Sequence, residues 1–118
     1  GGYTYFEQNT FPTNRLYFWV YTGLGESVSS TYNLNEWTHW VATWGNNTLK
    51  LYKNGVLVDT NDNVVLVINS SYNTYIGQNG IGTGYFNGML DEVAYWNRTL
   101  SLYDVQQLYN SGSGRSLI

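Results

Sequence analysis

The feature that most constrains this chain is an Asn-Gly pair placed between two short segments of alternating polarity. Asn54-Gly55 follows residues 49–53 and precedes residues 56–59. Both residues accept positive φ, so the pair forms the two-residue turn whose twist matches a β-hairpin. Similar short segments recur between Gly, Asn, Asp and Ser residues, a pattern typical of a sandwich or barrel. The sequence therefore predicts an all-β fold.

One helix is expected near the end of the chain. Ser101 is a suitable N-cap, and Asp104 lies three residues later, where its side chain can complete a capping box. Val105, Leu108 and Tyr109 then fall on one helical stripe that needs an apolar surface beneath it. The segments expected to form strands are 3–6, 15–22, 26–31, 37–44, 48–53, 56–59, 64–68, 72–77 and 85–96.

Composition narrows the classes of function. The 118 residues suffice for one domain, placed at 1–110, with 111–118 as a linker or tail. Five Lys and Arg residues and a net charge of -3 leave no basic surface for nucleic acid. The longest apolar run, 64–68, is too short to insert into a membrane.

The chain has the composition of a secreted all-β protein. It has no cysteine, which excludes thiolate metal sites and disulfides, and it is rich in Asn, Thr, Ser, Tyr and Gly. Three Asn-x-Ser/Thr sequons begin at Asn46, Asn69 and Asn97, and each is a candidate glycosylation site. The expected location is extracellular or at the cell surface.

An ordered series of sequence blocks carries a family resemblance. The blocks are WTHWVATW at 37–44, LKLYKNGV at 49–56, YIG at 75–77 and YFNGMLDEVAYWNRTLS at 85–101. In this order they resemble the laminin-G-like modules of the concanavalin A-like lectin/glucanase superfamily. The resemblance implies a two-sheet antiparallel jelly-roll sandwich with one short C-terminal helix.

The same resemblance implies a module that is incomplete at its N-terminus. Such modules usually begin with further strands, which would precede Gly1. A jelly roll without those strands exposes sheet edges, which favour pairing with another chain. We therefore expect association through an upstream segment, a neighbouring domain or another subunit.

Aromatic alternation gives the candidate binding face. In residues 15–22, Leu16, Phe18 and Val20 fall on one face of a strand and suit a core. The opposite face carries aromatic rings that can stack on sugars, unless another element covers them. Trp40, Ala42 and Trp44 match the family's core positions, which places Trp37, His39 and Val41 on the other side. The candidate ligand-binding residues are Tyr17, Trp19, Tyr21, Trp37, Asn79 and Asn87.

No residue pattern indicates catalysis. Asp91 and Glu92 are adjacent, and neighbouring strand residues point to opposite faces, so they do not form the carboxylate pair of a retaining glycosidase. His39 is the only histidine, with no motif for a triad or a zinc site. Asp91 is expected to tie a loop together; the alternative is that it helps to hold calcium, the one cofactor left open.

The resemblance implies a non-catalytic extracellular module for carbohydrate binding or adhesion. Its partner would be a glycan or a cell-surface ligand. A structural or assembly module of a cell-surface, filament or virion protein is the alternative, with contact to another subunit. A glycoside-cleaving enzyme is a third alternative, which lacks the paired acids.

Overall fold

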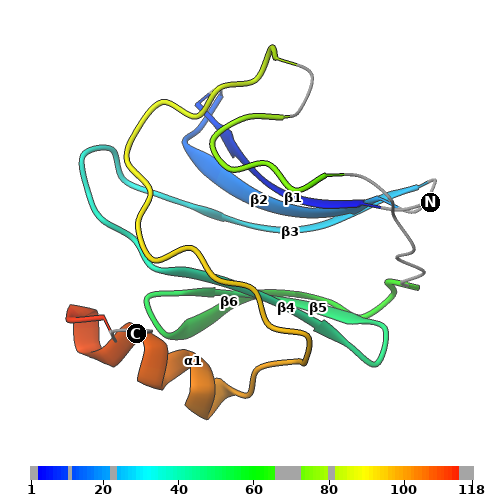
Figure 1. Ribbon diagram of the computed structural model, residues 1–118. Helices are drawn as coiled ribbons and strands as arrows, with labels where there is room; N and C mark the ends of the chain where they lie inside the picture. The colour runs from blue at the N-terminus through cyan, green and yellow to red at the C-terminus, as the bar shows by residue number, and fades with distance from the viewer. Residues whose placement is uncertain (1–2, 11, 22–23, 66–72, 80–81, 115–118) are drawn as a thin grey trace.

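The computed structural model describes residues 3–10, 12–21, 24–65, 73–79 and 82–114. Two antiparallel sheets of three strands each lie face to face, and a short helix covers the outer face of the second sheet (Figure 1). This confirms an all-β sandwich with one C-terminal helix. The first sheet contains β1 (Tyr3–Asn9), β2 (Arg15–Tyr21) and β3 (Gly25–Thr31). The second sheet contains β4 (Trp40–Gly45), β5 (Thr48–Lys53) and β6 (Val56–Asn61), followed by α1 (Leu102–Tyr109) and a single 3-10 turn, η1 (Asn110–Gly112).

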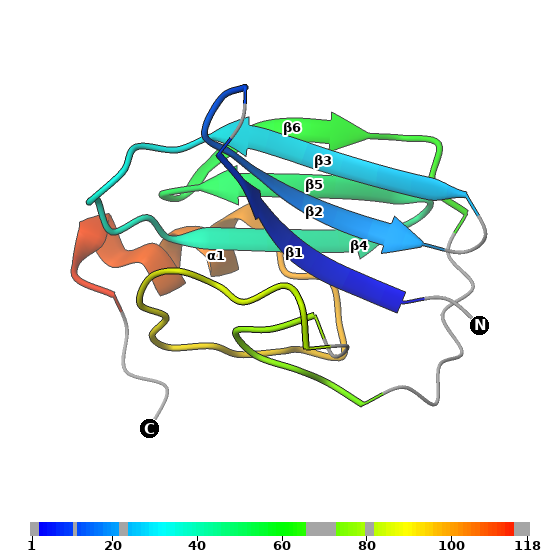
Figure 2. The same cartoon turned by 90° about the horizontal axis from the view of Figure 1, so that it is seen from above.

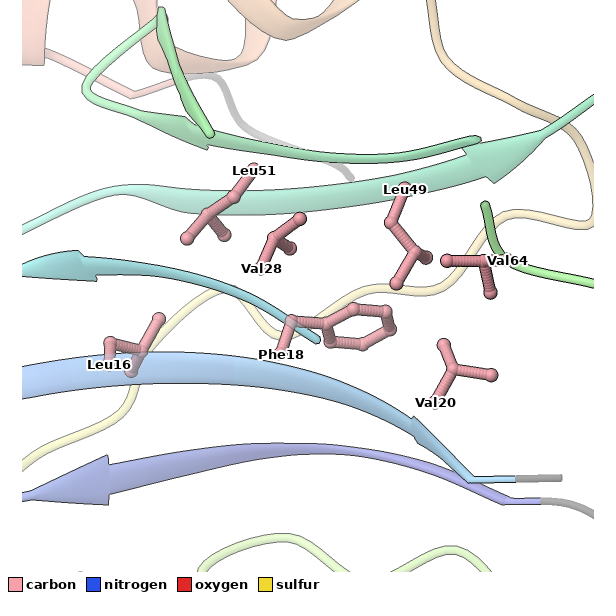
Figure 3. Close-up of a cluster of buried hydrophobic side chains, with 7 residues drawn as sticks. All are labelled: Leu16, Phe18, Val20, Val28, Leu49, Leu51 and Val64. Atoms are coloured by element: carbon pink, nitrogen blue, oxygen red, sulfur yellow. The ribbon is translucent and has the colours of Figure 1, made fainter. Parts of the chain in front are cut away.

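The main core lies between the two sheets. Its fully buried side chains come from β2, β3, β5 and the residue Val64, and Figure 3 shows them meeting in one layer. Leu16, Phe18 and Val20 point inward from β2, as the alternation predicted. Trp40, Ala42 and Trp44 are half-buried and pack against this cluster. The members of the cluster are Leu16, Phe18, Val20, Val28, Leu49, Leu51 and Val64.

A second, smaller core lies between the second sheet and α1. Val41 and Tyr52 point outward from the sheet and meet Leu100 and Val105. Val105 is fully buried, which confirms that the apolar stripe predicted for the helix packs against the sheet. Of the residues expected on this outer face, Val41 therefore packs on α1, whereas Trp37 and His39 precede β4.

Local signals for turns and caps are confirmed. Asn54 and Gly55 have φ values of 49° and 79°, as a two-residue hairpin turn requires. The hydroxyl of Ser101 accepts from the Asp104 N–H, and the Asp104 carboxylate accepts from the Ser101 N–H. A hydrogen bond from Arg98, together with those from Ser101, lowers the pKa of Asp104 to about 2, so the cap stays charged in mildly acidic solution.

The predicted strand over 85–96 is wrong. This segment is extended but does not join either sheet, and Tyr85 makes only an isolated bridge with Gln78. Apolar alternation can show that a segment suits a strand, but a strand also needs a neighbouring backbone to pair with. In Figures 1 and 2 the segment runs along the side of the sandwich on which β1 and β4 lie.

Three other predicted strands also need correction. Residues 73–77 and 64–65 form no strand, while 66–72 lie outside the described residues. The strand predicted to begin at Trp37 begins at Trp40, because its pairing partner β5 ends at Lys53. His39 instead bonds the turn that follows β5: its N–H donates to Asn54 Oδ1 at 2.9 Å, and its carbonyl accepts from the Asn54 N–H at 2.9 Å.

Candidate functional site

Five aromatic side chains gather on the outer face of the first sheet. Antiparallel pairing places Tyr3 opposite Tyr21 and Tyr5 opposite Trp19, so β1 extends the row that alternation predicted on β2. The pairing makes these residues one continuous patch, which we call the ring layer: Tyr3, Tyr5, Tyr17, Trp19 and Tyr21. The predicted residues Tyr17, Trp19 and Tyr21 are thus brought together.

Neighbouring rings of this layer stack on one another. Their centroids are 5.2 Å apart for Tyr3 and Tyr21, and 5.6 Å apart for Tyr17 and Trp19. The interplanar angles are 26° and 18°. Non-bonded carbon atoms stay about 3.5 Å apart, so near-parallel rings at these distances overlap partly face to face. The rings are therefore offset-stacked, and neighbouring rings touch at their margins rather than over their whole faces.

The ring contacts form a chain with two ends. They run from Tyr17 through Trp19 to Tyr5, and then through Tyr3 to Tyr21. Among the ring contacts of the described residues, Tyr17 touches only Trp19, and it is therefore a terminal ring with one face not stacked on a neighbour. Tyr21 is the other terminal ring, because among the described residues it touches only Tyr3.

Small residues of β3 form a lower strip beside the rings. Gly25 lies under the Trp19 ring, where an added Cβ would approach the ring to 3.3 Å. Ser27 and Ser29 stand opposite Trp19 and Tyr17 across the β2–β3 pair. The step from tall rings to short hydroxyl side chains leaves an edge along which an extended ligand can lie.

A polar depression lies beside this strip: it is lined by Ser29, the cross-strand neighbour of Tyr17, and not by Tyr17 itself. It has a volume of about 340 Å³, and its lining includes Arg15, Ser29, Thr31 and Asp59. Arg15 Nη1 donates to Ser29 Oγ at 3.3 Å, and the Ser29 N–H donates to Asp59 Oδ2 at 2.8 Å. A ring beside fixed donors and acceptors is the combination that recognises a molecule with both apolar and hydroxyl-bearing faces.

Charges near the ring layer are few. Burial raises the pKa of the Tyr5 phenol, and the Glu7 carboxylate and Tyr3 raise it further. Tyr5 therefore remains a neutral hydrogen-bond donor at physiological pH. Glu7 lies opposite Tyr17 on β1, and an anionic ligand here would meet this carboxylate.

The other predicted ligand residues lie in connecting segments rather than on the first sheet. Trp37 is 63% exposed in the connection between β3 and β4, and no ring contact among the described residues links it to the layer. Asn79 closes a turn by bonding Thr83, with its Nδ2 donating to Thr83 Oγ1 at 3.1 Å. Asn87 is exposed in the segment that follows. Their role in binding stays a prediction.

Asp91 forms a hydrogen bond within its own loop, as predicted. Its Oδ1 accepts from the Glu92 N–H at 2.9 Å, and Glu92 has a positive φ of 50°. Across the part of the chain that the structure describes, no three His, Asp or Glu side chains come together as metal ligands. Calcium also takes amide and backbone carbonyl oxygens, so a role of Asp91 in holding calcium stays a prediction.

His39 belongs to the packing of α1. Its ring centroid is 5.8 Å from that of Tyr109, and its Nδ1 is buried with no hydrogen-bond partner among the described residues. Burial lowers the pKa of His39, since the imidazolium loses hydration there. This is a structural histidine held neutral beneath the helix.

We expect the protein to lose stability as the pH falls below about 6.5, the usual pKa of histidine. The pKa of His39 is lower in the folded chain than in the unfolded chain, so the unfolded chain binds the proton first. Thermal unfolding between neutral and mildly acidic pH measures the effect. His39→Gln should flatten this part of the profile; an unchanged profile would exclude His39 as its source.

Two of the three sequons are exposed. Asn46 lies in the turn between β4 and β5, and Asn97 precedes α1. Asn69 lies outside the described residues. Within the described part of the chain, no helix has the length and apolar character needed to span a bilayer.

Sequence reasoning missed half of the site. Tyr3 and Tyr5 join the ring layer only through the register of β1 on β2, and Arg15, Ser29 and Asp59 meet through three different strands. Alternation in 3–6 could have indicated the two tyrosines. No local signal indicates the polar depression.

Comparison with known proteins agrees with the fold. Residues 1–106 match the family model Laminin_G_3, described as the concanavalin A-like lectin/glucanases superfamily. A search of curated proteins gives no match. Among solved structures, an S-layer domain-containing protein from Clostridium thermocellum ATCC 27405 is similar, with a TM-score of 0.62 and 20% identity. The alignment covers 92% of this chain and 63% of that chain. The chain belongs to the concanavalin A-like lectin/glucanase superfamily, as a laminin-G-like module.

Proposed function

We propose that this module binds glycans without catalysis and forms part of an extracellular or cell-surface protein. The observation that carries the proposal is the ring layer together with the polar depression that Ser29, the cross-strand neighbour of Tyr17, lines. A sugar has apolar C–H faces and a rim of hydroxyls. The Tyr17 ring can stack on the C–H faces, while Arg15 and the Ser29 hydroxyl can form hydrogen bonds with the sugar hydroxyls.

The charge around the depression favours a neutral glycan. The chain has a net charge of -3, and Glu7 and Asp59 flank the Tyr17 end from β1 and β6. An acidic sugar would gain from Arg15 but would be repelled by both carboxylates. We therefore expect neutral oligosaccharides to bind in preference to sialylated or sulfated ones.

The arrangement of acids supports binding rather than cleavage. Glu7 is on β1, whereas Asp59 reaches the opposite edge strand β3 from β6 of the second sheet, so at least two strand spacings of about 4.8 Å each separate their backbones. A retaining glycosidase needs carboxyl groups about 5–5.5 Å apart. In addition, Asp59 already accepts from the N–H groups of Ser29 and Thr60.

A glycan array probed with the purified module tests the proposal. Running it once with calcium and once with a chelator also tests the calcium alternative. We expect binding to a set of neutral glycans that is the same in both conditions. Binding only with calcium would contradict the proposed site, and no binding in either condition would overturn the proposal.

Assembly at a cell surface is the second candidate function. The similar solved structure comes from an S-layer domain-containing protein, and the chain presents a broad aromatic face on its first sheet. Attachment of the module to glycan-free subunits of its parent protein, with no response to sugars, would favour this function.

A further inference from the structure

The sequence contains three Asn-Gly pairs, at positions 54–55, 79–80 and 87–88. In such a pair the asparagine can lose its side-chain amide without an enzyme, because glycine has no side chain to keep its main-chain nitrogen away from the asparagine Cγ. Whether the reaction occurs depends on the structure around the pair. Gly80 lies outside the described residues, so the structure describes both members of the first and third pairs only.

The fold holds the pair Asn54-Gly55 in a closed environment. Asn54 Oδ1 accepts from the His39 N–H at 2.9 Å, and the Asn54 N–H donates to the His39 carbonyl at 2.9 Å. Gly55 is buried, and a Cβ placed on it would lie 3.0 Å from Cδ1 of Tyr109. The side-chain carbonyl is therefore held toward His39, and the Tyr109 ring keeps water from the Gly55 main chain. Attack within this pair requires the turn to open first.

The pair Asn87-Gly88 has none of these restraints. Both residues are exposed, in a segment that joins neither sheet. Among the described residues, no hydrogen bond involves the Asn87 side chain or the Gly88 N–H. The neighbouring main-chain bond, from the Phe86 N–H to the Gly77 carbonyl at 2.9 Å, ends one residue before the pair. The Asn87 side chain can therefore rotate until its Cγ meets the Gly88 nitrogen, in contact with water.

We propose that Asn87 is a site of spontaneous deamidation in the folded protein, whereas the fold protects Asn54. Hydroxide takes the proton of the Gly88 N–H, and the nitrogen attacks Cγ of Asn87. The new N–Cγ bond forms while the Cγ–Nδ2 bond breaks, and the amide nitrogen takes a proton from water and leaves as ammonia. Water then opens the cyclic imide at either carbonyl, which leaves aspartate or isoaspartate at position 87. The reaction consumes one water, releases one ammonia and needs no oxidant.

The reaction changes the charge of one side of the sandwich. The segment 85–96 also contains Asp91 and Glu92, both exposed, and it runs along the side on which β1 and β4 lie (Figures 1 and 2). A carboxylate at position 87 makes the chain one unit more negative than its formal charge of -3. Isoaspartate also lengthens the main chain there by one methylene. The charge of this side therefore increases with the age of the protein.

Peptide mapping of the folded module by tandem mass spectrometry, at intervals during incubation in mildly alkaline buffer, measures both positions in one molecule. We expect Asn87 to deamidate at least about tenfold faster than Asn54, because the reaction at Asn54 requires local opening of the turn. The rate at Asn87 should rise with pH, since the Gly88 nitrogen must first lose its proton. In guanidinium chloride, which unfolds the chain, the two rates should come close together.

Asn87→Gln is the matched control variant. Its amide lies one methylene farther from the main chain and cyclises more slowly, so the mass change at position 87 should disappear while the rate at Asn54 stays the same. Circular dichroism checks that the fold is retained. An Asn87 that does not react, equal rates at the two positions in the folded chain, or the same difference in denaturant would overturn the proposal. Because the measurement is a mass change, its result is independent of glycan binding.

Discussion

Replacing Leu51 by alanine is expected to lower the free energy of unfolding by about 3–4 kcal/mol. Leu51 is fully buried in the main core, facing the first sheet from the central strand of the second (Figure 3). Both sheets are held by hydrogen-bonded ladders, so neither side can close fully on the space left by the lost side chain. Such a loss is a large part of the 5–15 kcal/mol that stabilises a typical domain.

Chemical denaturation at neutral pH measures this loss. Leu57→Ala is the matched control, because it is the same substitution on the neighbouring strand β6, where the side chain is 44% exposed. The control should cost less than half as much. Equal losses for the two variants would mean that the layer between the sheets does not dominate stability.

Replacing Tyr17 by alanine is expected to weaken glycan binding about tenfold or more, a change of about 1.4 kcal/mol or more in binding free energy. Tyr17 is a terminal ring of the layer, and its cross-strand neighbour Ser29 lines the polar depression, so its removal takes away the stacking face while Arg15 and Ser29 remain. Titration calorimetry with the best ligand from the array gives the dissociation constants.

Two further variants make the result specific. Tyr17→Phe keeps the ring and loses only the hydroxyl, and it should retain most of the affinity if stacking dominates. Tyr103→Ala removes a tyrosine that is 69% exposed on α1, and it should bind like the wild type. If Tyr103→Ala weakens binding as much as Tyr17→Ala does, the ligand does not sit at the ring layer.

Local patterns predicted the fold well where one segment contains all the information. The alternation in β2 placed Leu16, Phe18 and Val20 in the core, because successive strand residues face opposite sides. The Asn54-Gly55 turn and the Ser101 cap depend on residues within a few positions of each other. These are properties that a short stretch of sequence fixes by itself.

The failures concern information that lies in another part of the chain. The segment 85–96 has the composition of a strand, but it lies beside the sandwich without a strand to pair with. Val41 lies on the face of β4 away from the main core, as predicted, but only the docking of α1 could show that the helix covers it there. Likewise, Tyr5 enters the candidate site through its pairing with Trp19.

The position of α1 gives the module a defined front and back. The helix and Gly114, the last described residue, lie on the side of the second sheet, and the ring layer lies on the opposite outer face (Figure 1). Anything tethered to the chain after α1 would therefore sit behind the sandwich. A module immobilised through that end would present its aromatic rings outward, toward whatever approaches from solution.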